Sequence, residues 1–247
     1  MLGRTISFLV ICVSILSQAM AQPVRIAHDQ NFPPFSISID GNSQGLAVDI
    51  LRAAAARVGI EIMFVPVPFD QRQVTLEAGQ ADAYFPLSIT PERRQSFDFS
   101  EVLVVTGGSV FVRAPNVPPD TLDALSGKVV VTPQTGPIAA FVKRTAPTIK
   151  LVVTVDYEDS LGRLVRGEAD AAVLSYHVGQ RFVDRLYPGQ ISRSPSMFLE
   201  LPLAVAVAKE KNGPLLTKLN EGIAAIRADG TWKQINDRWA ERLPSIR

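Results

Sequence analysis

Residues 69–83 read FDQRQVTLEAGQADA, and residues 157–171 read YEDSLGRLVRGEADA. Every matching pair, from Phe69 and Tyr157 to Ala83 and Ala171, lies 88 residues apart over these 15 positions. In each copy a helical pattern leads into a glycine, an Ala-Asp-Ala turn and an apolar strand. A constant offset over this length predicts two lobes of like construction.

Strand and helix patterns alternate on either side of each copy. In the first half, the sequence predicts strands over 24–28, 61–66 and 81–87, and helices over 46–58 and 69–78. In the second half, it predicts strands over 128–131, 150–155 and 169–174, and helices over 138–144 and 157–165. This order is typical of an α/β fold in which mostly parallel sheets are flanked by helices.

Two apolar runs are predicted to connect the lobes. The first, 102–112, contains Gly107 and Gly108, and the second, 201–208, would carry the chain back as the other strand of a hinge. The amphipathic segments 213–227 and 231–242 have no strand of their own, so they are expected to pack on the first lobe. The predicted domains are 22–112 plus 206–247 for lobe 1 and 113–205 for lobe 2. A cleft between two lobes is the default place for a small ligand.

The N-terminal segment 1–21 has the pattern of a signal peptide. Arg4 precedes the short apolar run 6–16, and Ala19-Met20-Ala21 places small residues before Gln22. The run is shorter than the about 20 residues that a membrane-spanning helix needs. The sequence therefore predicts an exported, periplasmic protein without membrane insertion; a buried N-terminal helix is the alternative.

Charge and composition exclude several classes of function. Without residues 1–21, the chain has 24 basic and 24 acidic residues, which disfavours nucleic acids and anionic membranes as partners. The two histidines and the single Cys12, which lies within the signal peptide, give no metal-binding spacing. We expect no metal and no cofactor. Gly107-Gly108-Ser109 lacks the closing glycine of a nucleophile motif, so no catalytic residue is predicted.

The stretch SITPERR, residues 88–94, is the strongest candidate for an anion site. Thr90 is predicted to cap a helix with Pro91 at its first position. Arg93 would then lie in the first turn, where the helix dipole disfavours a cation unless an anion binds there. Backbone amides, the Ser88 hydroxyl and the Arg93 guanidinium would converge on a carboxylate.

A solvated Arg93, paired with Glu92 or Asp98, is the alternative interpretation of this stretch. The neighbouring Arg94 is expected to be solvated in either case.

Other candidates come from both halves of the chain. Thr135 and Gly136 lie in a turn between a predicted strand and a predicted helix. Asp29 ends the first predicted strand, Phe32 follows it, and Phe69 begins the helix predicted over 69–78. The two rigid aromatic rings are placed to cover a ligand, although such rings also serve as core residues.

Several motifs together resemble one family. They are VRIAHD (24–29), FPPF (32–35), GLAVDI (45–50), GQADA (79–83), SITPER (88–93), FDFS (97–100) and ADGTW (228–232). In order and spacing they resemble the bacterial extracellular solute-binding proteins of family 3, the periplasmic receptors of polar amino-acid ABC importers. The resemblance spans essentially the whole mature chain. It implies a two-lobed type II periplasmic binding fold that closes on its ligand, and a membrane permease as partner; a monomer is expected.

The resemblance also implies roles for individual residues. Arg93 matches the arginine that holds the ligand α-carboxylate, with Ser88 beside it. Phe32 matches the aromatic that lies over the ligand, Asp29 matches a cleft residue and Phe69 matches a side-chain pocket residue.

In the second lobe, the turn with Thr135 and Gly136 matches a further contribution to the carboxylate site. The chain departs from the family where an acidic residue usually meets the ligand ammonium, because Ser175 stands there. An unpaired ammonium in a closed cleft is costly. The ligand is therefore expected either to lack an α-amino group or to place it against Asp29 or the segment 156–159.

Two other functions remain open at this stage. The fold resembles that of exported cyclohexadienyl or arogenate dehydratases, which need a general acid in the cleft; the glutamate that those enzymes carry near the position of Ser175 is absent. The other alternative is a binding module that serves an accessory role without transport. Asp49 and Asp82 match family positions and are predicted to be structural.

Overall fold

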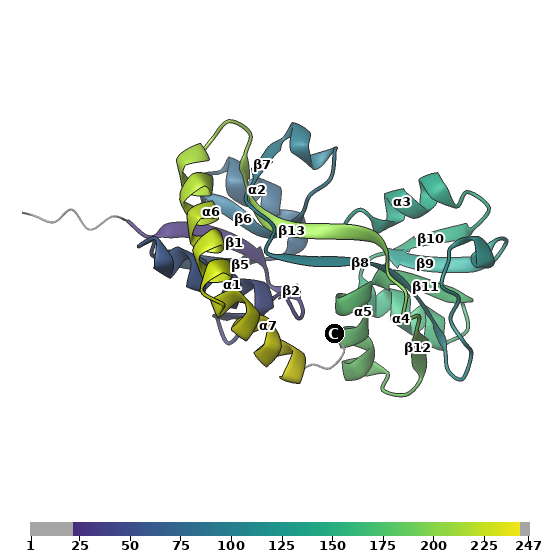
Figure 1. The fold of residues 1–247 in the computed structure, drawn as a ribbon. Coiled ribbons are helices and arrows are strands. Elements are labelled where there is room, and N and C mark those ends of the chain that lie inside the picture. Colours follow the sequence, from purple (N-terminus) through teal and green to yellow (C-terminus); the bar gives the residue numbers. More distant parts are fainter. Residues whose placement is uncertain (1–21, 243–247) are drawn as a thin grey trace, which may run out of the picture.

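Two lobes, joined by two long strands, make up the computed structural model, which describes residues 22–242 (Figure 1). The joining strands are β8 (Val104–Arg113) and β13 (Phe198–Ala208). The predicted signal peptide, 1–21, lies outside the described residues. Within them, every helix is too short or too polar to cross a membrane.

Lobe 1 is built on the parallel strands β5 (Ile62–Val67), β1 (Val24–Asp29) and β6 (Ala83–Ser88), in that order. The helix α1 (Leu46–Arg57) turns the predicted apolar face into the core. Both C-terminal helices, α6 (Gly213–Ala228) and α7 (Thr231–Arg242), pack on α1, as the sequence predicts. Asp49 is structural, because its Oδ2 accepts a hydrogen bond from Trp239 Nε1 at 2.9 Å.

Lobe 2 repeats this order. Its parallel strands are β10 (Lys150–Thr154), β9 (Val129–Pro133) and β11 (Ala171–Ser175). The helices are α3 (Ile138–Thr145), α4 (Tyr157–Val165) and α5 (Tyr176–Leu186). The sequence analysis missed α5, which follows β11 without a loop, and the short strand β12 (Ile191–Arg193).

The repeated Ala-Asp-Ala turn performs the same task in both lobes. The Asp82 carboxylate accepts a hydrogen bond from the backbone N–H of Arg25 in β1 at 2.9 Å. The Asp170 carboxylate accepts one from the backbone N–H of Val129 in β9 at 2.8 Å. Each aspartate also donates its own N–H to the carbonyl of that strand residue. The repeat thus ties the third strand of each lobe to the first.

The crossing strands run antiparallel to each other and to their neighbours in both lobes, so ten strands form one continuous sheet. In β8, Gly108 lies so close to Phe198 that a Cβ there would stand 2.4 Å from the aromatic ring, so a larger residue would force the ring to move. Both strands belong to both lobes. The predicted domain limits, 22–112 with 206–247 for lobe 1 and 113–205 for lobe 2, therefore stay a proposal.

Several short elements, most of which the sequence analysis did not predict, complete the fold. The strands β2 (Asn31–Phe32), β3 (Ser36–Ile39) and β4 (Asn42–Gln44) form a small sheet just after β1, and β7 (Phe97–Phe99) pairs with β13. The predicted helix over 69–78 begins as a single 3-10 turn, Phe69–Gln71, and continues as α2 (Arg72–Glu77). Another 3-10 turn, Asp123–Leu125, precedes β9.

Candidate functional site

A cavity of about 650 Å³ lies between the lobes, a size suited to a small ligand. Both lobes contribute to its walls. The eight predicted site residues all line it: Asp29, Phe32, Phe69, Ser88, Arg93, Thr135, Gly136 and Ser175. The structure therefore brings together residues that are far apart in the sequence, while their part in ligand binding stays a prediction.

Arg93 is held at the wall of the cavity by the end of β6. Its Nη1 donates to the Ser88 carbonyl oxygen at 3.0 Å and also to the Ser88 hydroxyl. The Thr90 hydroxyl accepts from the Arg93 backbone N–H at 3.2 Å, as a capping residue would. The predicted helix is wrong, however, because only one 3-10 turn, Arg93–Gln95, forms before β7 begins. A helix dipole therefore plays no part in this site.

No ion pair neutralises the charge of Arg93 among residues 22–242, although the exposed Glu92 is near enough to act on it. Burial, and then the positive charge of Arg72, lower the pKa of Arg93 to about 10, so it stays protonated at neutral pH. Among residues 22–242, no carboxylate oxygen lies within 4.0 Å of its guanidinium nitrogens. The alternative partner Asp98 is bound instead by Lys209 Nζ at 2.7 Å. Arg94 is exposed, as predicted.

Asp29 places a negative charge in the same region. It ends β1, is only 8% exposed, and accepts a hydrogen bond from the Asn31 backbone N–H at 2.9 Å. Burial raises the pKa of its carboxyl to about 6, against the lowering effect of that hydrogen bond and of Arg72. The carboxyl is therefore mostly ionised at pH 7 and takes up a proton in mildly acidic solution.

Arg72 is a cavity residue that the sequence analysis missed. It is the first residue of α2, and its Nη1 donates to the Phe69 carbonyl oxygen at 2.7 Å. The Arg72 guanidinium carbon lies 4.0 Å from the centre of the Phe69 ring, a cation–π contact. The three-residue spacing from Phe69 would have placed Arg72 beside the aromatic ring.

The second lobe presents hydroxyl groups rather than cations. Ser175 ends β11, and its hydroxyl lies 3.1 Å from the Thr106 hydroxyl of β8. The Thr135 hydroxyl is buried without a hydrogen-bond partner among the described residues. Tyr157, another lining residue that was missed, is the counterpart of Phe69 in the repeat, and that offset would have identified it.

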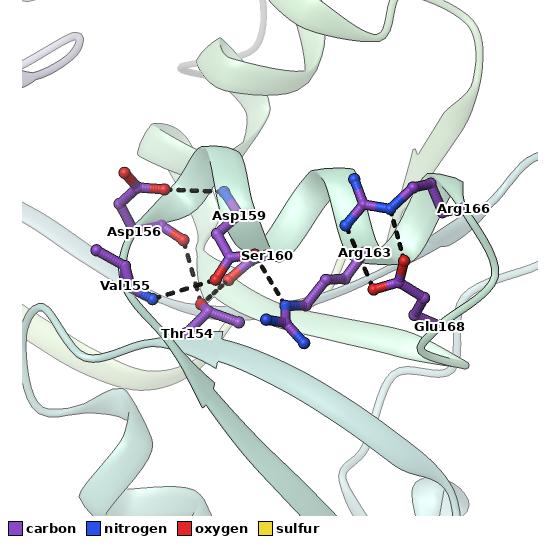
Figure 2. Close-up of polar contacts among 8 residues, drawn as sticks. All are labelled: Thr154, Val155, Asp156, Asp159, Ser160, Arg163, Arg166 and Glu168. Carbon is purple, nitrogen blue, oxygen red and sulfur yellow. Dashed lines mark hydrogen bonds and ion pairs between the residues drawn. The ribbon is translucent and has the colours of Figure 1, made fainter.

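Acidic residues of α4 stand at the cavity from lobe 2, and Figure 2 shows how the start of this helix is fixed. Asp156, which lines the cavity, caps α4 by accepting from the Asp159 backbone N–H at 2.8 Å. Asp159 does not line the cavity and pairs with Arg163 at 2.8 Å, which lowers its pKa. Glu158 also lines the cavity but is paired with Arg185 at 2.7 Å, so Asp156 is the acid of the segment 156–159 that is better placed to meet an ammonium group.

Metal binding has no support in the part of the chain that the structure describes. Among residues 22–242, no three histidine, cysteine, aspartate or glutamate side chains gather as metal ligands would.

Comparison with known proteins identifies the family. The profile of the bacterial extracellular solute-binding proteins, family 3, matches residues 24–242, so the chain belongs to this family. A sequence relative is the ABC transporter arginine-binding protein 1 of Escherichia coli (strain K12). It is 25% identical over 224 residues, which cover 89% of this chain and 91% of that protein.

Solved structures show the same fold. An ancestral arginine-binding protein bound to arginine has a TM-score of 0.77 and 27% sequence identity, covering 89% of this chain and 99% of its own. A histidine kinase sensor domain with similarity to periplasmic binding proteins has a TM-score of 0.80 at 22% identity, covering 88% of this chain and 96% of its own. The two-lobed α/β periplasmic binding protein fold is thus confirmed.

Proposed function

We propose that this protein is a periplasmic receptor that captures a small carboxylate-bearing solute between its lobes and delivers it to the permease of an ABC importer. The solute is an amino acid or a related organic acid. The observation that carries the proposal is the Arg93 guanidinium, which faces the cavity without a carboxylate partner among residues 22–242. A ligand carboxylate supplies the missing counter-charge through charge-assisted hydrogen bonds.

The two lobes divide the task of holding this carboxylate. Arg93 and Ser88 bind it from lobe 1. The Thr135 hydroxyl, which has no hydrogen-bond partner among residues 22–242, and the Gly136 turn approach it from lobe 2. A ligand that contacts both lobes stabilises their closed arrangement, since it loses its contacts with one lobe when they separate. The crossing strands β8 and β13 are the hinge about which the lobes move.

The amino group of such a ligand has fewer possible partners. Ser175 carries no charge, whereas Asp29 is buried in the same cavity and Asp156 lines it from lobe 2. Asp29 is the better partner, because an ion pair formed away from solvent is screened less than one at the mouth. Transport of an amino acid agrees with the names of the relatives, which are arginine-binding proteins.

Thermal unfolding in the presence of amino acids and organic acids tests this proposal. A bound solute raises the melting temperature by mass action. We expect Arg93→Ala to abolish this shift, whereas the matched control Arg94→Ala, at the exposed neighbour, keeps it. Circular dichroism before heating establishes that both variants are folded. Unchanged affinity in Arg93→Ala would show that this residue is not the anchor.

A second candidate function has one observation in its favour. A carboxyl with a pKa of about 6 in a cleft, as burial gives Asp29, suits a general acid, which a dehydratase-like enzyme on this fold would need. Incubation with prephenate and a direct assay for phenylpyruvate test it, with Asp29→Asn as the control. If wild type forms no more phenylpyruvate than Asp29→Asn does, the enzymatic function is rejected and the binding function remains.

A further inference from the structure

Two guanidinium groups, rather than one, face the cavity between the lobes. Arg72 and Arg93 both line it, and neither forms an ion pair with another residue in the range 22–242. They are near enough for the charge of one to act on the other. Two like charges in a partly desolvated site repel, and a ligand with anionic groups relieves this repulsion.

The position of Arg72 also determines which charged ligand groups can approach the Phe69 ring in the cavity. The Arg72 guanidinium covers one face of the Phe69 ring at 4.0 Å and is fixed there by its bond to the Phe69 carbonyl oxygen. A cationic ligand side chain that approaches this face meets a resident cation. An anionic group that approaches it meets a donor with a rigid fork of N–H groups.

The buried charges favour an anion as well. Asp29 is the acid of the cavity that is almost fully buried, at 8% exposure. The other lining acids, Asp70, Asp156 and Glu158, are exposed, and Arg185 binds Glu158 at 2.7 Å. Solvent and salt screen such exposed charges. The inner wall therefore carries two positive charges against one negative charge.

We propose that the solute is a small dicarboxylate, with one carboxylate on Arg93 and the second on Arg72. This inference rests on the proposed function and narrows its ligand class. An acidic amino acid also places its ammonium group near Asp29. Each of its three charged groups then meets one protein group of opposite charge: its two carboxylates meet the two arginines, and its ammonium meets Asp29. A dicarboxylic acid without an amino group uses the same two arginines and leaves Asp29 to take up a proton.

Calorimetric titration with matched pairs of ligands tests the second carboxylate. The pairs are glutamate with glutamine and aspartate with asparagine, because each pair differs only in the distal charge. Glutarate tests whether the amino group is needed, and arginine represents the cationic ligands of the relatives. We expect the acid of the preferred pair to bind at least about 10-fold more tightly than its amide, as for other charge-assisted contacts. Tighter binding of arginine than of every dicarboxylate would overturn the inference.

The variant Arg72→Gln tests whether Arg72 causes the preference for the acid over its amide. It keeps a polar side chain of similar reach but removes the charge, and we expect the acid-to-amide affinity ratio to fall to near one. Arg94→Gln is the matched control and should leave the ratio unchanged. A ratio that persists in Arg72→Gln would contradict the assignment.

These experiments separate the inference from the proposed function. If a monocarboxylate or arginine binds and depends on Arg93 but not on Arg72, the receptor function stands and the dicarboxylate inference fails. If no carboxylate binds wild type, the proposed function itself fails. If a carboxylate binds but Arg93→Ala leaves its affinity unchanged, Arg93 is not the anchor, and the two-arginine site fails with it.

Discussion

The two lobes share their construction but differ in the chemistry that they bring to the cavity. Each has three parallel strands in the same order, and each ties its third strand to its first through the aspartate of an Ala-Asp-Ala turn. Lobe 1 brings Arg72, Arg93 and the buried Asp29. Lobe 2 brings mainly hydroxyl groups and exposed acids.

This difference indicates a division of labour. The charged groups of lobe 1 are fixed before a ligand arrives, because Arg93 is bonded to Ser88 and Arg72 to Phe69. Such fixed groups lose little conformational entropy on binding. The neutral donors of lobe 2 add contacts on closure without a large cost of desolvation. The common scaffold thus supports an anchoring lobe and a closing lobe.

Lobe 1 also depends on helices that lobe 2 lacks, and Gly222→Ala tests that dependence. A Cβ at Gly222 in α6 would lie 2.2 Å from the Ala54 carbonyl oxygen of α1. We expect a loss of about 3 kcal/mol in the free energy of unfolding, since backbone must move to make room. Urea denaturation measures it. Gly213→Ala, at an open position of the same helix, is the control; equal effects of the two substitutions would show that α1 and α6 are not in close contact.

The buried charge of lobe 1 predicts a dependence of stability on pH. The folded-state pKa of Asp29, about 6, lies above its ordinary value of 3.8, so the folded state binds this proton more tightly than the unfolded state. Its contribution to stability is therefore full below about pH 4 and falls as the pH rises to about 6, by up to roughly 3 kcal/mol.

Asp29→Asn removes this titration. The ligand-free variant should be more stable than wild type at pH 7 and should lose the corresponding decline between pH 4 and 6. Denaturation at several pH values measures both. A variant that is less stable at pH 7 would contradict the view that the carboxylate is kept there for binding.

The shared turn provides a direct comparison of the lobes. Asp82→Ala and Asp170→Ala each leave a strand N–H without its carboxylate partner, and each should cost about 1–2 kcal/mol of stability. Substitution of either aspartate by asparagine keeps an acceptor and should cost less. Asp82→Ala also removes the half-exposed ion pair with Arg25 Nη2 at 3.1 Å, so its loss should be equal or slightly larger. A clearly smaller loss in Asp82→Ala than in Asp170→Ala would mean that the sequence repeat does not reflect equal structural roles.

The smallest effect is expected from a hydroxyl of lobe 2. Ser175→Ala removes the contact with the Thr106 hydroxyl but no charge, so the affinity for the solute should fall only a few-fold, corresponding to about 0.5–1 kcal/mol. Calorimetry compares it with Arg93→Ala. An equally large loss in both variants would place a main anchor in lobe 2 as well.

The sequence predicted those helices and strands that are determined by residues close together in the chain. The strands and helices of the repeat were predicted because their apolar patterns and turns are local. The helix after Thr90 was wrong because β7 begins only two residues after the 3-10 turn ends. The helix α5 was missed because it follows β11 without an intervening turn pattern. The strands β2 to β4 are only two to four residues long, too short to show a periodicity, although Asp40-Gly41 between β3 and β4 is a hairpin-turn signal that the sequence analysis overlooked.

The sequence by itself determined the two-lobed α/β organisation, the two crossing strands and eight residues of one cavity, because periodicity, turns and family motifs are written along the chain. Only the tertiary structure decided which charges meet there. It showed that Asp98 is bound by Lys209, that Arg93 has no carboxylate partner among residues 22–242, and that Arg72 lies over Phe69 in the same cavity. The physical reason is that pairing of charges depends on distances in space, which residue order does not contain.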